Sequence, residues 1–104
     1  MRHRYWLLIP LIILLAAPVS PAQNSRSAET LLKRGLRQFA KGNLDGAITL
    51  YSKAIALNPG LTKAYVNRGK ARRVKGNLDG AINDYEKALE IDPRAADLDA
   101  RDFS

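Results

Sequence analysis

The sequence predicts an all-α fold built from two consecutive helix-turn-helix units. The eight residues KGNLDGAI occupy positions 41–48 and return at 75–82, which is 34 positions later. When residues 28–61 are laid over residues 62–95, 14 of the 34 positions are identical. Each unit also has Lys-Gly-Asn near its middle and an Asn-Pro or Asp-Pro pair at its end, and these pairs stop one helix and begin the next. A fixed period of this size indicates repeats that stack on one another.

The first 22 residues have the layout of a secretory signal. Arg2 and Arg4 precede an apolar run at residues 5–19, and the small side chains of Ser20 and Ala22 follow. The pattern predicts cleavage after Ala22, and therefore an exported protein that is periplasmic or secreted. A flexible start is expected at residues 23–27.

A permanent membrane anchor is the alternative interpretation of the same segment. The apolar run at residues 5–19 is shorter than the roughly 20 residues that a membrane-spanning helix needs, and Pro10 and Pro18 interrupt it. An anchor in the inner membrane by residues 5–19 is therefore less favoured than a cleaved signal, and cleavage would leave no stable membrane span.

The composition excludes several classes of function. The chain of 104 residues has a formal net charge of +7, no cysteine and one histidine, His3, which lies in the predicted signal. Without cysteine there is no disulfide framework, so stability has to come from helix packing. A mature chain without His or Cys lacks the usual nucleophile–base pair and the nitrogen and sulfur metal ligands. We expect no catalytic residues, no metal, no cofactor and no small-molecule substrate.

The two units divide into helices at the same places. Residues 28–61 form the first unit and residues 62–95 the second, and in each the Gly-Asn pair ends one helix and caps the next. The carboxylates of Asp45 and Asp79 then fall in the first turn of their helices, where they complement the helix dipole. Residues 96–104 are either a partial capping helix or a frayed tail. In the capping interpretation a short helix begins near residue 94, with Leu98 and Phe103 covering the second unit.

These residues resemble the tetratricopeptide repeat, whose 34-residue pattern has small residues at positions 8, 20 and 27, an aromatic at 24 and proline at 32. The resemblance implies antiparallel helices stacked as a short right-handed α-solenoid. Leu31 and Tyr65 stand where the family often has tryptophan, and Arg34 and Arg68 where it has leucine. The matching positions are Gly35, Ala47, Tyr51, Ala54, Pro59, Gly69, Ala81, Tyr85, Ala88 and Pro93.

The repeated residues also have a physical interpretation of their own. Gly35 and Ala47 lack bulk, so the two helices of a unit can approach closely, and Ala54 does the same for the next unit. The ring of Tyr51 fills the space between the helices. The recurrence of KGNLDGAI is therefore structural, because it encodes the turn, the cap and the close contact.

Family members hold a peptide or a partner helix in a concave groove lined by the first helix of each repeat. The resemblance implies that the groove-facing positions here include Glu29, Ala40 and Val74. The candidate binding residues are Leu32, Lys33, Leu36, Phe39, Lys63, Val66, Asn67, Lys70 and Arg73. The groove-facing positions of the first unit are mostly apolar, and those of the second unit are mostly basic. This combination fits a peptide with an apolar segment and an acidic end. Of the pattern with which some relatives clamp a terminal carboxylate, only Asn67 is present.

The helix expected near residues 62–75 carries six basic residues and no acid. Such a uniform charge favours a binding face, whereas a solvated face usually mixes signs. The alternative is that this helix is merely soluble and opposes the acidic second helix of its own unit. The acids of that helix are Asp79, Asp84, Glu86, Glu90 and Asp92.

The sequence thus predicts a non-catalytic protein–protein interaction module, or scaffold, in the cell envelope. One alternative is an electrostatic binder of an anionic envelope polymer or membrane surface, whose affinity would collapse with salt. Another is a homo-oligomeric structural piece, since an open stack can associate with its own copy. Only Tyr65 offers a stacking ring among the cations of the helix near residues 62–75, which argues against a nucleic-acid partner.

Overall fold

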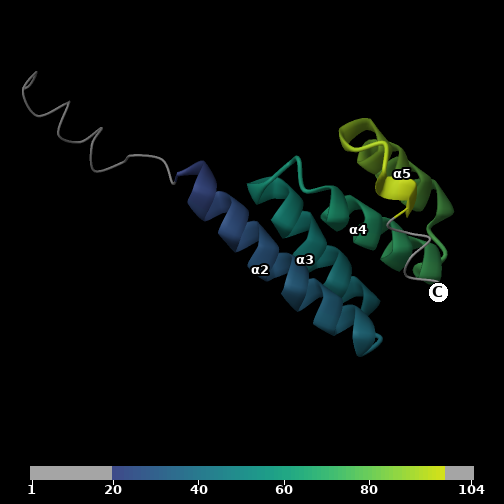
Figure 1. Cartoon of the computed structure of the whole chain (residues 1–104). Coiled ribbons are helices and arrows are strands. Elements are labelled where there is room, and N and C mark those ends of the chain that lie inside the picture. Colours follow the sequence, from purple (N-terminus) through teal and green to yellow (C-terminus); the bar gives the residue numbers. More distant parts are fainter. Residues whose placement is uncertain (1–19, 98–104) are drawn as a thin grey trace, which may run out of the picture.

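The computed structural model describes residues 20–97, and these form four helices followed by a single helical turn at residues 95–97 (Figure 1). Successive helices pack side by side in chain order, and no strand occurs within the described range. The all-α prediction and the two helix-turn-helix units are confirmed. The helices are α2 (Pro21–Ala40), α3 (Leu44–Leu57), α4 (Thr62–Lys75) and α5 (Leu78–Ile91).

The helix α2 begins earlier than the sequence suggested. Residues 23–27 were expected to be a flexible start, but they belong to the first turns of α2. Pro21 occupies the start of the helix, where its missing N–H costs nothing, and the hydroxyl of Ser20 accepts a hydrogen bond from the backbone N–H of Gln23 at 3.3 Å. These two start signals outweigh the low helix propensity of the serines and asparagine that follow. The predicted signal falls mostly on residues 1–19, which lie outside the described range, as do Leu98 and Phe103.

The two turns inside the repeats have the structure that Lys-Gly-Asn predicted. The backbone of the glycine is left-handed in both, with φ of 82° at Gly42 and 94° at Gly76. The side chains of Asn43 and Asn77 then accept a hydrogen bond from the backbone N–H three residues later, at 3.1 and 3.0 Å. Each turn therefore ends one helix and caps the next with adjacent residues.

A glycine packed against a tyrosine sets the distance between the two helices of each repeat. A Cβ atom added to Gly35 would lie 2.5 Å from Cε1 of Tyr51, and one added to Gly69 would lie 2.9 Å from Cε1 of Tyr85. Tyr51 is almost fully buried, and this burial raises its pKa to about 12, so the ring stays neutral at ordinary pH.

The remaining repeat positions have the predicted structural roles. Pro59 and Pro93 lie in the exposed turns after α3 and α5. The small residues between the helices are all buried, and they are Ala47, Ala54, Ala81 and Ala88.

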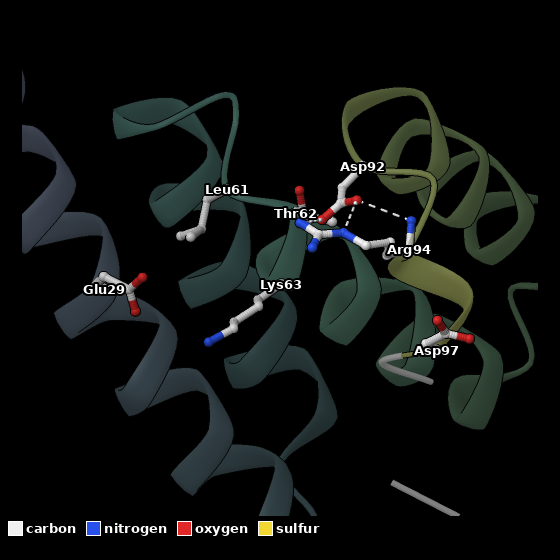
Figure 2. Close-up of a pocket in the computed structure, with 7 residues that line it drawn as sticks. All are labelled: Glu29, Leu61, Thr62, Lys63, Asp92, Arg94 and Asp97. Atoms are coloured by element: carbon white, nitrogen blue, oxygen red, sulfur yellow. Dashed lines mark hydrogen bonds and ion pairs between the residues drawn. The ribbon is translucent and has the colours of Figure 1, made fainter. Parts of the chain in front are cut away.

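The array has an inner side and an outer side. Helices α2 and α4 contact each other, whereas α3 and α5 do not, so among the four described helices α2 and α4 lie on the inner, concave side. The turn at residues 95–97 lies beyond the first turn of α4, so that this end of α4 stands between α2 and the turn (Figure 2). Two parallel first helices therefore present one common face.

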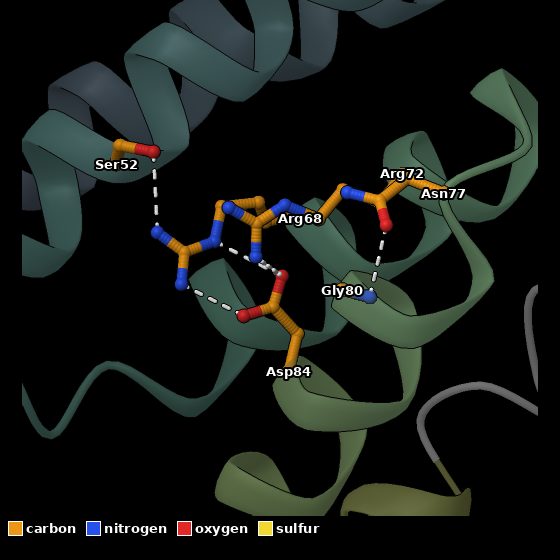
Figure 3. Close-up of polar contacts among 6 residues, drawn as sticks. All are labelled: Ser52, Arg68, Arg72, Asn77, Gly80 and Asp84. Carbon is orange, nitrogen blue, oxygen red and sulfur yellow. Dashed lines mark hydrogen bonds and ion pairs between the residues drawn. The ribbon is translucent and has the colours of Figure 1, made fainter.

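A buried carboxylate ties α4 to α5 (Figure 3). The side chain of Asp84 is 4% exposed and accepts hydrogen bonds from Arg68 at 2.7 and 3.0 Å and from Arg72 at 2.8 Å. Arg68 also donates to the hydroxyl of Ser52 on α3, at 3.1 Å, and its guanidinium lies 5.7 Å from the ring centre of Tyr65. One ion cluster thus joins three helices.

This cluster changes the interpretation of the basic helix. Arg68 and Arg72 are paired with Asp84, and Lys75 is paired with Asp45 at the start of α3. Two of the six cations of α4 therefore face the acidic second helix of their own unit, as the alternative interpretation proposed, and Lys75 reaches the preceding repeat instead. The first repeat has Leu50 where the second has Asp84, so the first repeat has no equivalent of this carboxylate.

We expect Gly35→Ala to lower the free energy of unfolding by about 1–2 kcal/mol, because the cost of overpacking, about 1–3 kcal/mol, exceeds the roughly 1 kcal/mol that alanine gains in a helix. Gly69→Ala should cost less, because its clash is milder. Gly60→Ala is the control, since its Cβ would meet only Oδ1 of Asn58, at 3.6 Å. Chemical denaturation of the three variants measures the effect. Equal stabilities would refute the close packing.

We expect Asp84→Asn to lower the free energy of unfolding by about 2–4 kcal/mol, because it leaves two arginines without their anion in a largely buried position. The range extends down to about 2 kcal/mol because the side chains of Arg68 and Arg72 are 16% and 25% exposed, so water can partly solvate the unpaired arginines. Lys87→Ala is the control, since it breaks only the exposed pair with Glu90 and should change stability by less than about 0.5 kcal/mol. Urea unfolding followed by circular dichroism compares them, and similar losses for both would contradict the role of the cluster.

Candidate functional site

The inner face of α2 presents an apolar side chain among charged ones. Leu36 is 42% exposed, and Glu29, Lys33 and Ala40 are also exposed. These residues recur at intervals of three and four, so they share one side of the helix. Four of the predicted groove-facing positions on α2 are therefore accessible.

Two predicted contact residues are not accessible. Leu32 and Val66 are buried, Leu32 in the cluster that includes Tyr51 and Ala64, and Val66 in the cluster that includes Ala88. The expectation that they line the binding surface is corrected, because the fifth position of each repeat turns inward to pack against neighbouring helices.

Phe39 and Lys70 are intermediate cases. The ring of Phe39 is half-buried and packs against the first core cluster, so only part of it can reach a ligand. Lys70 is mostly buried, although it is charged. Both stay close to the inner face but present less surface than predicted.

The inner face of α4 is polar and basic at both ends. Lys63, Arg73 and Val74 are exposed. Asn67 is half-buried, and its side-chain amide donates a hydrogen bond to the backbone carbonyl of Lys63 at 2.8 Å. The single residue that matches the carboxylate-clamp pattern is therefore bonded to its own helix.

A cavity of about 410 Å³ opens at the amino-terminal end of this face (Figure 2). Glu29, Lys63 and Asp97 line it, and they are spaced by 34 residues, so they are the second residues of three successive repeat registers. Their alternating charges follow from three different side chains at one repeat position. The other lining residues are Leu61, Thr62, Asp92 and Arg94.

One wall of the cavity is an ion pair. The side chain of Arg94 donates to the carboxylate of Asp92 at 3.1 and 3.3 Å, and the backbone N–H of Arg94 donates to it at 3.0 Å. These hydrogen bonds lower the pKa of Asp92, and the carboxylate in turn raises the pKa of Arg94. The opposite charges of Asp92 and Arg94 cancel each other. The remaining charged lining residues are two acids, Glu29 and Asp97, and one base, Lys63, so this end of the inner face is mildly acidic.

Sequence reasoning assigned two of the cavity residues, Glu29 and Lys63, to the groove. The 34-residue period also places Asp97 where some relatives have a lysine of the carboxylate clamp, but Asp97 was not among the candidate binding residues. The pair formed by Asp92 and Arg94 has no such signal, because it depends on the conformation of the turn after α5.

The described part of the chain shows neither a metal cluster nor a transmembrane segment. Between residues 20 and 97 no group of three or more His, Cys, Asp or Glu side chains is placed to hold a metal ion. Over the same range, no helix is both long enough and apolar enough to span a bilayer.

Comparison with protein families gives two matches. A model described as "Tetratricopeptide repeat" matches residues 62–94, and one described as "TPR repeat" matches residues 35–72. Together they cover residues 35–94, which is more than half of the 104 residues. A search of curated proteins gave no match.

Two crystal structures of MamA resemble the chain, with TM-scores of 0.62 and 0.60 and 37% sequence identity in each case. Each alignment covers 67% of this chain but only 41% and 38% of the MamA chains, so this chain spans less than half of their length. Tetratricopeptide repeats are typically non-catalytic modules for protein–protein interaction. The family models, the 34-residue period and the paired helices agree, and the chain belongs to the tetratricopeptide repeat family, with tandem repeats in α2–α3 and α4–α5.

Proposed function

We propose that the chain is a non-catalytic scaffold in the cell envelope that holds a peptide or a partner helix across the inner face of α2 and α4. The observation that carries the proposal is an exposed apolar side chain, Leu36, flanked by basic side chains of both helices on one face. Val74, at a groove-facing position of α4, is a second exposed apolar side chain on this face, and apolar side chains inside a polar rim are the arrangement found at protein–protein interfaces.

The charge distribution suggests how the partner is oriented. The cavity end carries Glu29 and Asp97, whereas the last turn of α4 carries the exposed Arg73. A partner with an acidic end would place that end near Arg73, and its apolar segment would cross Leu36. The cavity end would then favour a neutral or basic group.

This partner chemistry is favoured over purely electrostatic binding of a polymer or membrane. Three cations of α4 are already paired with Asp84 and Asp45, which reduces the charge available to a polyanion. Contact through Leu36 would also keep a salt-resistant component that phosphate or carboxylate polymers lack.

The envelope location rests on the sequence pattern of the signal. Cleavage after Ala22 would remove Ser20 and Pro21, and with them the side-chain cap of α2, a feature worth about 1 kcal/mol. The mature helix would then start within the residues that follow.

A photo-crosslinking amino acid at position 36 tests the inner face directly. In the full chain produced in its native host, we expect position 36 to crosslink to a protein partner in high salt as well as in low salt. Position 57 is the matched control, because Leu57 is also exposed but lies on α3. Equal adducts from both positions, or adducts that vanish with salt, would contradict the proposal.

Amino-terminal sequencing of the chain from a cell-envelope fraction tests the location. We expect the mature chain to begin at Gln23, because Ser20 and Ala22 supply the small residues that the signal peptidase recognises. A chain that keeps Met1 in the membrane fraction would indicate the anchor by residues 5–19, and a chain that keeps Met1 in the cytosol would refute export.

A further inference from the structure

On α5, the face that corresponds to the α4-contacting face of α3 is called its outer face here. It exposes apolar side chains whose equivalents on α3 are half-buried. Leu78, Ile82 and Leu89 are 59%, 53% and 43% exposed. They recur with the helical period and form one stripe. The residues 34 positions earlier, Leu44, Ile48 and Ile55, are all half-buried. Ile48 and Ile55 pack against the core cluster that includes Ala64 and Ala71 of α4.

The helix α4 shows what covers this stripe in the first repeat. It packs against α3 with Ala64 and Ala71, which are fully buried. Two polar contacts flank them, one between Lys75 and Asp45 and one from Arg68 to the hydroxyl of Ser52. The cover is therefore an amphipathic helix with two small residues and two cations, the cations being seven positions apart.

The face of α5 is more acidic than the face of α3 that it repeats. Asp79 stands at the place of Asp45, and Glu86 stands at the place of Ser52. Both side chains are exposed, next to the apolar stripe. A helix in the place that corresponds to α4 would therefore meet two carboxylates at the positions where it carries Arg68 and Lys75.

We propose that the outer face of α5 docks a basic amphipathic helix of a partner protein, which packs on α5 as α4 packs on α3. This docking site is on a different face from the groove of α2 and α4, so the two proposals stand or fall separately. The continuity with the α3–α4 contact supplies the geometry, and Asp79 and Glu86 supply the charge that selects a basic helix.

The chain's own segments fit this place less well. Within the described range, residues 96–97 stand at its first two positions, and Ala95 is buried as Leu61 is. The residue that corresponds to Arg68 is Asp102, which carries the wrong charge opposite Glu86.

The helix α2 of a second copy also fits less well. It has Arg34 and Lys41 at the two cationic places. However, it has Arg37 where α4 has the fully buried Ala71, so its face does not have the small residue that close packing needs.

A peptide with the sequence of residues 64–75 is the probe, because α4 is the helix that the corresponding face of α3 binds. A staple between positions 66 and 70 keeps it helical, and Val66 packs toward α5 in the chain, so the staple leaves the α3-facing side unchanged. We expect the labelled peptide to bind the full chain in fluorescence anisotropy, with the chain at a concentration where sedimentation shows a monomer.

Charge reversal at Glu86 tests where the peptide binds. We expect Glu86→Arg to weaken binding by at least about tenfold, and a peptide carrying Arg68→Glu to recover it on that variant. The control is Glu90→Arg, the same change on the same helix, because its counterpart Ala56 is exposed rather than covered. Circular dichroism verifies that each variant is folded, and Glu86→Gln provides a milder change if Glu86→Arg is not.

Three results would overturn the proposal. One is the absence of peptide binding to the wild-type chain. Another is an equal loss of affinity in the Glu86 and Glu90 variants. The third is self-association of the chain that excludes the peptide at every concentration, which would assign the face to a second copy.

Discussion

The close approach of a glycine backbone to a tyrosine ring is the constraint on which the rest of the structure depends. No side chain fits between Gly35 and the ring of Tyr51, and the same contact recurs between Gly69 and Tyr85. It fixes the spacing of the two helices within each repeat. Because both repeats have the same internal spacing, the helices stack in a regular array, and the first helices of both repeats share one face.

Identical residues build the array, and differing residues give each repeat its own surface. The KGNLDGAI segments form the same turn and the same cap twice. By contrast, the position held by Leu50 in the first repeat is held by Asp84 in the second, where it anchors two arginines. The second residue of each register differs as well, and the cavity at the end of the inner face gains its mixed charge from that variation. Any binding specificity would arise from such positions rather than from the repeated motif.

The sequence allowed the fold to be predicted almost completely, because the period, the Gly-Asn turns and the prolines each have a local physical cause. The accessibility of the inner face was predicted less well. Leu32 and Val66 sit at a position that a family pattern assigns to the groove, yet burial depends on how neighbouring helices pack, which one repeat does not reveal. The sequence analysis gave the pairing of α4 with the acids of α5 only as an alternative and did not single out Asp84, since the cluster joins residues of two helices that are 12 and 16 positions apart. The helical start of α2 depended on Ser20 and Pro21, which the sequence reasoning had assigned to the signal.

The central claim is that each helix is stabilised by the helices packed on both sides of it. Among the second helices of the two repeats, α5 has an exposed apolar face where α3 is covered by α4, so α5 should be the less stable of the two. Native-state amide hydrogen exchange of the full chain tests it most directly, because it reports the stability of each helix separately. We expect the amides of α3 and α4 to exchange slowest and those of α5 to exchange faster than the corresponding amides of α3. Equal protection of α3 and α5 would show that the outer face of α5 is already covered, and it would contradict this account.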